Sequence, residues 1–102
     1  MRYHMYMARR YRDPATEDIA NGHPSKAARR QLPESLHHKA AVKIKFLRTM
    51  QTLSDLKNLG FGLHQLKGDR KGQWALKIND QYRICFLWDG NQAYEIEVGD
   101  YH

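Results

Sequence analysis

The chain has 102 residues, enough for one domain and too few for two that fold independently. Hydrophobic residues make up 41% of it and charged residues 27%, a balance that excludes wholesale disorder. Seventeen Lys and Arg against eleven Asp and Glu give a net charge of +6, which favours a polyanion such as nucleic acid as partner. Small basic proteins without any such partner also exist, so the charge alone decides nothing.

Neither a membrane span nor a secretion signal is predicted. No segment reaches the ~18 consecutive apolar residues of a span, and no apolar core follows the early arginines. The one cysteine, Cys85, lies inside an apolar strand pattern, so we expect it to be structural, with no internal disulfide. We therefore expect a cytoplasmic protein with no membrane contact, a single domain over residues 1–102, and a flexible lead over residues 1–8.

The N-terminal half predicts two helices. Arg9 to Asp13 suits a short edge strand, followed by a helix over Ala15 to Asn21 that begins near Pro14. A breaker cluster over residues 21–24 ends this helix, and a polar basic linker over residues 25–30 leads to Pro33.

The second helix starts at Pro33 and is marked by apolar residues at helical spacing, which form one stripe: Leu36, Ala40, Ile44, Leu47 and Met50. Basic side chains lie on its other sides, where they are either solvated or in contact with RNA: His38, Lys39, Lys43, Lys45 and Arg48.

The C-terminal half predicts strands. Leu63 to Leu66 suits a short strand, and Gly68 to Gly72 a turn rather than a phosphate-binding loop. Three alternating apolar runs follow, around Trp74 to Ile78, Tyr82 to Trp88 and Tyr94 to Val98, with turns at residues 79–80 and 89–91 between them. The striped helix is the large apolar surface that can cover these strands. The fold class is therefore α+β, a mainly antiparallel sheet packed against two helices.

The polar side chains that suit chemistry gather around this sheet. Arg83 alternates with Tyr82 and Ile84, which places it on the face that the helix leaves open. Lys67 ends the short strand, and Asp100, Tyr101 and His102 end the last one, so strand ends can bring them to one rim. Taken without further information, Arg83 equally suits an ion pair with Glu95 or Glu97, Lys67 a solvated position, and the final residues a frayed end.

No metal site is predicted, since no pair of histidines has a recognised ligand spacing with acidic or cysteine partners. Trp74 and Trp88 follow the apolar alternation, so we expect both in the core rather than stacked on bases.

Three pieces of the sequence, in their order and spacing, resemble HigB toxins of the RelE-like superfamily. They are Leu66-Lys67-Gly68-Asp69-Arg70 followed by Trp74, then Asn79-Asp80-Gln81-Tyr82-Arg83-Ile84, and the final Asp100-Tyr101-His102. The resemblance covers about residues 9–102. It implies a RelE-like, microbial-RNase-type fold and a plasmid-maintenance-type toxin that inhibits translation by cleaving mRNA in the ribosomal A site, without metal or cofactor. It also implies a helix-turn-helix, HigA-like antitoxin as partner, through which alone the toxin would reach operator DNA.

Carried over position by position, the resemblance implies five active-site residues: Lys67, Arg83, Asp100, Tyr101 and His102. Further residues are expected to bind RNA: His64, Arg70, Lys71 and Lys77. His64 is also a candidate member of the site itself. The loop over residues 59–62 is where we expect family members to differ in length.

The chemistry of RNA cleavage agrees with these residue types. Without a metal, the 2′-hydroxyl attacks the neighbouring phosphate, so protons must be moved and a charged phosphorane stabilised. An imidazole such as that of His102 suits proton transfer, with Asp100 orienting it. The guanidinium of Arg83 and the ammonium of Lys67 suit the phosphorane. The ring of Tyr101 suits stacking on RNA.

Two other functions stay open from the sequence. One is a non-catalytic ribosome or RNA binder that blocks translation with the same basic surface. The other is a gyrase-poisoning toxin on the same superfold, because a fold hosts several functions. Intact message would favour the first, and the Asp100-Tyr101-His102 ending argues against the second.

Overall fold

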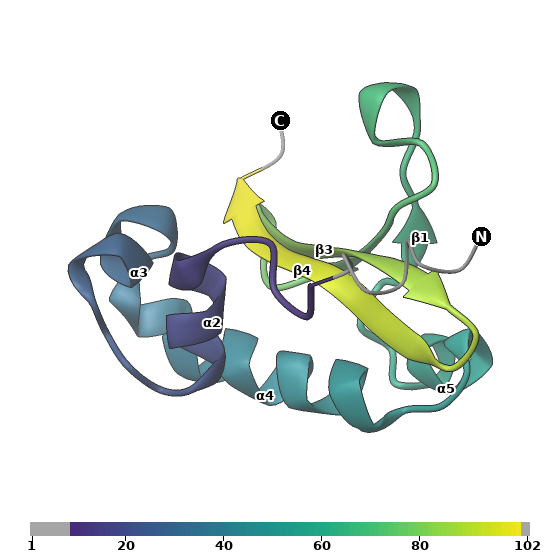
Figure 1. Cartoon of the computed structure of the whole chain (residues 1–102), viewed down its shortest axis with the longest axis horizontal. Coiled ribbons are helices and arrows are strands. Elements are labelled where there is room, and N and C mark those ends of the chain that lie inside the picture. The colour runs from purple at the N-terminus through teal and green to yellow at the C-terminus, as the bar shows by residue number, and fades with distance from the viewer. Residues whose placement is uncertain (1–8, 101–102) are drawn as a thin grey trace.

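In the computed structural model, which describes residues 9–100, an antiparallel sheet lies over one long helix (Figure 1). The helices come first along the chain: α2 Pro14–Ala20, α3 Lys26–Gln31, the 3₁₀ turn η1 Glu34–Leu36, α4 His37–Thr49 and α5 Leu53–Asn58. The strands follow: β1 His64–Gln65, the 3₁₀ turn η2 Gly68–Arg70, β2 Trp74–Lys77, β3 Tyr82–Asp89 and β4 Gln92–Asp100. The predicted α+β class is confirmed.

The four strands form one sheet in sequence order, with every neighbouring pair antiparallel. The predicted meander is therefore confirmed, although the short strand spans two residues rather than four. The predicted apolar stripe is confirmed by α4, which buries Ala40, Ile44 and Leu47, but this helix begins at His37 and not at Pro33. The turn before β3 is closed by Asn79, whose side-chain oxygen accepts from the amides of Gln81 and Tyr82 at 2.9 and 2.8 Å. This bonding is typical of an Asx turn.

One prediction about the helices is wrong. Residues 25–30 are not a linker, because Lys26–Gln31 forms α3. The Ser25 hydroxyl accepts from the Ala28 amide at 3.1 Å and caps this helix, which buries Ala28 against the core. α5 was also not predicted. Its cap is Thr52, whose hydroxyl accepts from the Asp55 amide at 3.0 Å, and it buries Leu56.

The segment from Arg9 to Asp13 is predicted as an edge strand, but it forms only a single isolated bridge. Tyr11 pairs in parallel with Ile96 of β4. The cause is a bulge in β4: two residues, Glu95 and Ile96, face one residue of β3, and Glu95 has a φ of 50°. The amides of both turn outward and bond the Arg9 and Arg10 carbonyls at 2.8 and 3.0 Å. A regular ladder cannot form beside this kink.

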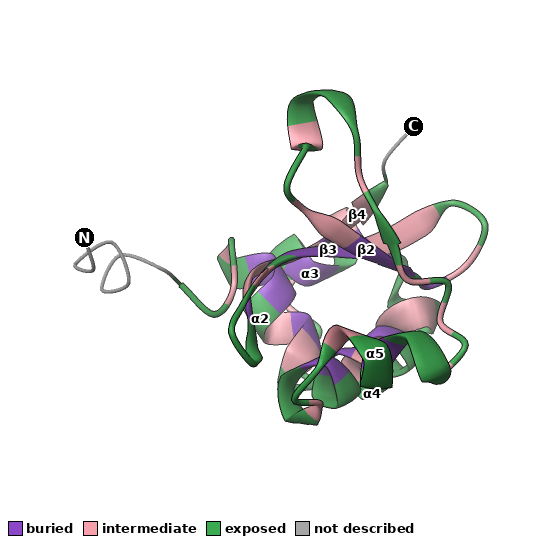
Figure 2. Cartoon of the chain, turned by 90° about the vertical axis from the view of Figure 1, so that its right-hand side faces the viewer, coloured by how far each residue is buried: buried purple, intermediate pink, exposed green. Residues whose placement is uncertain are grey.

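The core lies between the sheet and α4. From α4 come Ala40, Ile44 and Leu47, and from the sheet come Leu76, Ile84, Phe86 and Val98, all fully or almost fully buried. Burial of this apolar surface is the main stabilising contribution. Trp74 and Trp88 are half-buried and pack against the same core, as predicted. Figure 2 shows α4 and α5 on one side of the sheet and the largely exposed β1–β2 connection on the other.

Candidate active site

The candidate site is the face of the sheet opposite α4. Two rows of paired residues cross this face, because directly opposed residues in antiparallel strands share a side of the sheet. One row runs from Lys77 through Arg83 to Gly99, and the next joins His64 and Ala75 to Cys85 and Glu97. Figure 1 shows the β1–β2 connection and the end of β4 rising on this same side. The predicted orientation of Arg83 is therefore confirmed.

Arg83 forms no ion pair with any acidic residue between positions 9 and 100. Its side chain is half-buried, and its Nη1 atom is buried with no hydrogen-bond partner within residues 9–100. The β4 residue beside it is Gly99, which has no side chain to cover it. A buried guanidinium nitrogen that bonds nothing is costly unless an anion from outside completes it.

The ion pairs proposed for Arg83 from the sequence do not form. Glu95 is bound by Arg9, with 2.9 Å between Nη2 and Oε1. That hydrogen bond, outweighing some desolvation, holds the pKa of Glu95 below its ordinary value. Glu97 is shared by Arg70 at 3.3 Å and Arg12 at 3.8 Å. Neither glutamate is thus left to pair with Arg83.

Arg70 connects the β1–β2 loop to the sheet. Its guanidinium donates to Gln73 at 3.0 Å and to Glu97 at 3.3 Å, and its side chain is 32% exposed. Arg70 was predicted to bind RNA, and the structure places it in this internal contact. The same loop carries Lys67, an exposed residue that makes no ion pair with any described residue, and the exposed Lys71. Arg70 therefore fixes the segment that presents both lysines.

Asp100 lies at the end of β4 and faces away from Arg83. It is paired with Tyr82, whereas Arg83 is paired with Gly99, so strand alternation puts the two side chains on opposite sides of the sheet. Asp100 is exposed and accepts from the Gln81 side chain at 2.8 Å. The predicted residues Tyr101 and His102 lie outside the described part of the chain.

His64 and Lys77 occupy the two rows already defined. The Nδ1 atom of His64 lies 2.9 Å from the Gly62 carbonyl oxygen, which can only accept, so Nδ1 carries the proton and Nε2 is left for another partner. Lys77 lies directly opposite Arg83 and pairs with the fully exposed Asp80 at 3.0 Å. Its position beside Arg83 suits contact with a second phosphate oxygen.

Two side chains that the sequence did not single out hold the end of β4. Thr16 of α2 is fully buried and its hydroxyl accepts from the Val98 amide at 3.1 Å. Gln31 of α3 donates to the Val98 carbonyl at 2.8 Å and to Asp13 at 3.1 Å. These contacts span 82 and 67 residues of sequence, and they hold β4 two residues before Asp100. A hydroxyl and an amide on short helices give no sequence signal of such a role.

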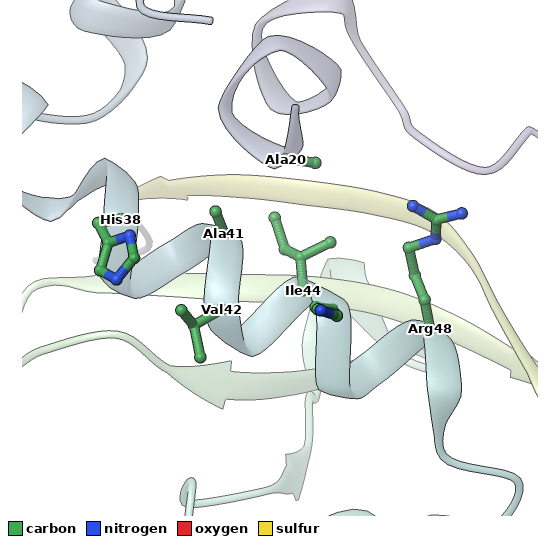
Figure 3. A pocket seen from close by; sticks show the side chains of 7 residues that line it. Ala20, His38, Ala41, Val42, Ile44 and Arg48 are labelled. Carbon is green, nitrogen blue, oxygen red and sulfur yellow. The ribbon is translucent and has the colours of Figure 1, made fainter. Parts of the chain in front are cut away.

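Other features of the described chain do not add to this site. Between residues 9 and 100, no three His, Cys, Asp or Glu side chains come close enough to hold a metal ion. No helix in this range is long and apolar enough to cross a membrane. A hollow of about 330 Å³ lies between α2 and α4, where Ala20 faces Ala41 and Ile44 (Figure 3), and Arg83 is not among the residues that line it.

The chain is similar to known toxins of one family. The sequence profile described as RelE-like toxin of type II toxin–antitoxin system HigB matches residues 4–102. A protein from Proteus vulgaris named Endoribonuclease HigB is 32% identical over 60 residues, which are 59% of this chain and 65% of that one. Toxin HigB-1 from Vibrio cholerae serotype O1 is 33% identical over 60 residues, 58% of this chain and 63% of that one. The alignments thus span just under two thirds of these relatives.

Proposed function

Because the chain belongs to the RelE-like HigB toxins of type II toxin–antitoxin systems and has their α+β fold, we propose that it is an endoribonuclease that cleaves mRNA on the ribosome and so inhibits translation. The observation that carries the proposal is the buried Nη1 of Arg83 on the open face of the sheet, which finds no hydrogen-bond partner in the described part of the chain. The name of the Proteus vulgaris relative, Endoribonuclease HigB, supports the same activity.

In this proposal the 2′-hydroxyl of a nucleotide in the ribosomal A site attacks the adjacent phosphate without a metal. The bond from phosphorus to the 5′ oxygen breaks, one proton leaves the 2′-hydroxyl and another reaches the departing oxygen. Arg83 stabilises the phosphorane, because a fixed guanidinium matches two of its oxygens. Lys67 adds a second positive charge from the loop held by Arg70.

The remaining roles follow the family resemblance. His102 transfers a proton, Tyr101 positions the RNA and Asp100 supports them. His64 is a second candidate for proton transfer, since its Nε2 is available once Nδ1 bonds the Gly62 carbonyl. Lys71 and Lys77 contact phosphates. Arg70 is assigned a positioning role in place of direct RNA contact, because its guanidinium is engaged with Gln73 and Glu97.

The ribosome is required in this proposal because the domain is too small to hold many bases. The decoding site would orient the message and so supply part of the catalytic advantage. A protein antitoxin with a helix-turn-helix is the proposed partner that silences the toxin and connects it to operator DNA.

Primer extension on a message with and without translating ribosomes tests the proposal. Breaks in the translated message, with naked RNA cut poorly, are the expected result. Stalled ribosomes on an intact message would instead indicate a non-catalytic protein that blocks translation. Linearised DNA in a gyrase assay would instead indicate a gyrase poison. Equal cleavage of naked and translated message would remove the ribosome from the mechanism.

A further inference from the structure

Three lysines line a hollow at the end of β2, where the row of Lys77, Arg83 and Gly99 reaches the edge of β2. Lys39 and Lys43 come from α4 and Lys77 from β2, and Phe61 and Asn79 complete the wall. We call this feature, which encloses about 310 Å³, the lysine hollow. None of the residues that line it is acidic.

The central ammonium group of the hollow is fixed in place. Lys43 Nζ donates to the Lys77 carbonyl at 2.7 Å and lies 4.8 Å from the centre of the Phe61 ring. Both contacts hold the ammonium group at the wall of the hollow. Ordering a lysine side chain in this way costs side-chain entropy and hydration, so it brings little benefit to a lysine that is only solvated.

The charges of the hollow are poorly balanced. Desolvation and then repulsion by Lys39 and Lys77 lower the pKa of Lys43 from its ordinary value. Within the described residues, Asp80 is the only acid that forms an ion pair with any of the three lysines, and its side chain is fully exposed. Exposed pairs of this kind are weak and screened by salt. An anion bound in the hollow would relieve this repulsion.

The hollow adjoins the candidate active site through Lys77, which lies opposite Arg83 across β2 and β3. An RNA strand with its scissile phosphate on Arg83 can therefore place another phosphate in the hollow. We propose that the lysine hollow is a second phosphodiester site, which binds RNA next to the phosphate that Arg83 contacts. The inference rests on the proposed function for its RNA ligand. That RNA is either the message or ribosomal RNA.

Binding measurements test the hollow apart from cleavage. The probes are a labelled single-stranded RNA made uncleavable by 2′-O-methyl groups, and vacant ribosomes. Lys39→Gln combined with Lys43→Met removes two charges but keeps the apolar stem on Phe61. Lys26→Gln combined with Arg30→Gln removes the same charge from exposed positions of α3. Lys39→Glu alone changes an exposed residue, and Lys43→Arg keeps the charge.

We expect Lys39→Gln combined with Lys43→Met to weaken binding by about fivefold or more. The magnitude of the slope of log K against log salt should fall by about 0.7, the value for one phosphate contact in single strands. Lys39→Glu should also weaken binding. Lys43→Arg keeps the positive charge, so its binding should stay close to that of wild type. Loss with the oligonucleotide assigns the message, and loss with vacant ribosomes assigns ribosomal RNA. Either result supports the site.

The proposal is overturned if the hollow variants match wild type with both probes, if the α3 control weakens binding equally, or if wild type binds neither probe. Cleavage assays separate this result from the proposed function. If the protein binds RNA through the hollow but does not cleave it, the second phosphodiester site is supported and the proposed nuclease function is rejected. If the protein cleaves RNA and the variants bind as wild type does, the nuclease function is supported and the second site is rejected.

Discussion

The buried hydroxyl of Thr16 accepts the amide hydrogen of Val98 at 3.1 Å and so joins α2 to the end of β4. We predict that Thr16→Val lowers the free energy of unfolding by about 1–3 kcal/mol, because the buried Val98 amide loses its partner. Urea unfolding measures the change. The matched control is Thr49→Val, whose exposed hydroxyl bonds only its own helix, and which should stay within about 0.5 kcal/mol of wild type. Equal losses in the two variants would contradict the role of the Thr16 contact.

Arg83→Ala should slow single-turnover cleavage on programmed ribosomes by about 10²-fold or more, since a preorganised charge acts mainly on the transition state. Thermal stability should hold, because Glu95 and Glu97 are bound by other arginines. Arg48→Ala, which removes an exposed arginine of α4, is the control. A parallel loss of stability and activity in Arg83→Ala would instead make Arg83 a structural residue.

The pairing of Arg70 with Glu97 gives a test of how Arg70 acts. If Arg70 positions the loop that carries Lys67, Glu97→Gln should slow cleavage about as much as Arg70→Ala, and the double variant should add little. Stability should change by only about 0–1 kcal/mol, because both side chains are partly exposed. Should Arg70→Ala impair cleavage while Glu97→Gln leaves it intact, Arg70 touches the RNA directly.

The low pKa of Glu95 predicts a pH dependence of stability. A carboxylate whose folded-state pKa is depressed stabilises the fold above its unfolded-state pKa, and this contribution is lost as the pH falls through the folded-state pKa. The hydrogen bond from Arg9 is the main cause of the depression. The stability difference between wild type and Glu95→Gln should therefore be constant near neutral pH and shrink at acid pH. Unfolding curves at several pH values measure it, and a constant difference down to acid pH would contradict the prediction.

His102, assigned from the family resemblance, should be needed for proton transfer. We predict that His102→Gln slows single-turnover cleavage by roughly 10²- to 10⁴-fold with little change in thermal stability. Rates between about pH 5.5 and 8.5 should lose the step that a histidine titration gives in wild type. His38→Gln, at an exposed position of α4, should leave the profile unchanged. A variant that keeps more than about a third of the rate would leave proton transfer to His64, Tyr101 or the ribosome.

The predictions from sequence worked where a pattern repeats over many residues. The apolar stripe from Leu36 to Met50 identified α4, and strand alternation oriented Arg83 correctly. They failed for α3 and α5, because six residues give fewer than two helical turns and so too short a pattern.

For the candidate site, the sequence predicts which residue types are present but not which residues they contact. The contact of Arg9 with Glu95 crosses 86 residues, and it depends on a bulge that no local pattern marks. Strand alternation also puts Asp100 on the opposite side of the sheet from Arg83. This result can be derived only when the pairing register of β3 and β4 is known. Register is set by tertiary packing, so residue lists from a motif do not give mutual geometry.

The outer edge of β4 has a consequence for how a protein partner can bind. Residues 9–12 bond β4 at Glu95 and Ile96, and the side chains of Thr16 and Gln31 bond it at Val98. A peptide that recognises a sheet by adding a strand needs free main-chain groups along an edge. On β4 those groups are taken by the chain itself at Glu95, Ile96 and Val98, and β1 at the other edge is two residues long. We therefore expect the proposed antitoxin to recognise this protein through side chains, in a groove or on the basic face, and not by extension of the sheet.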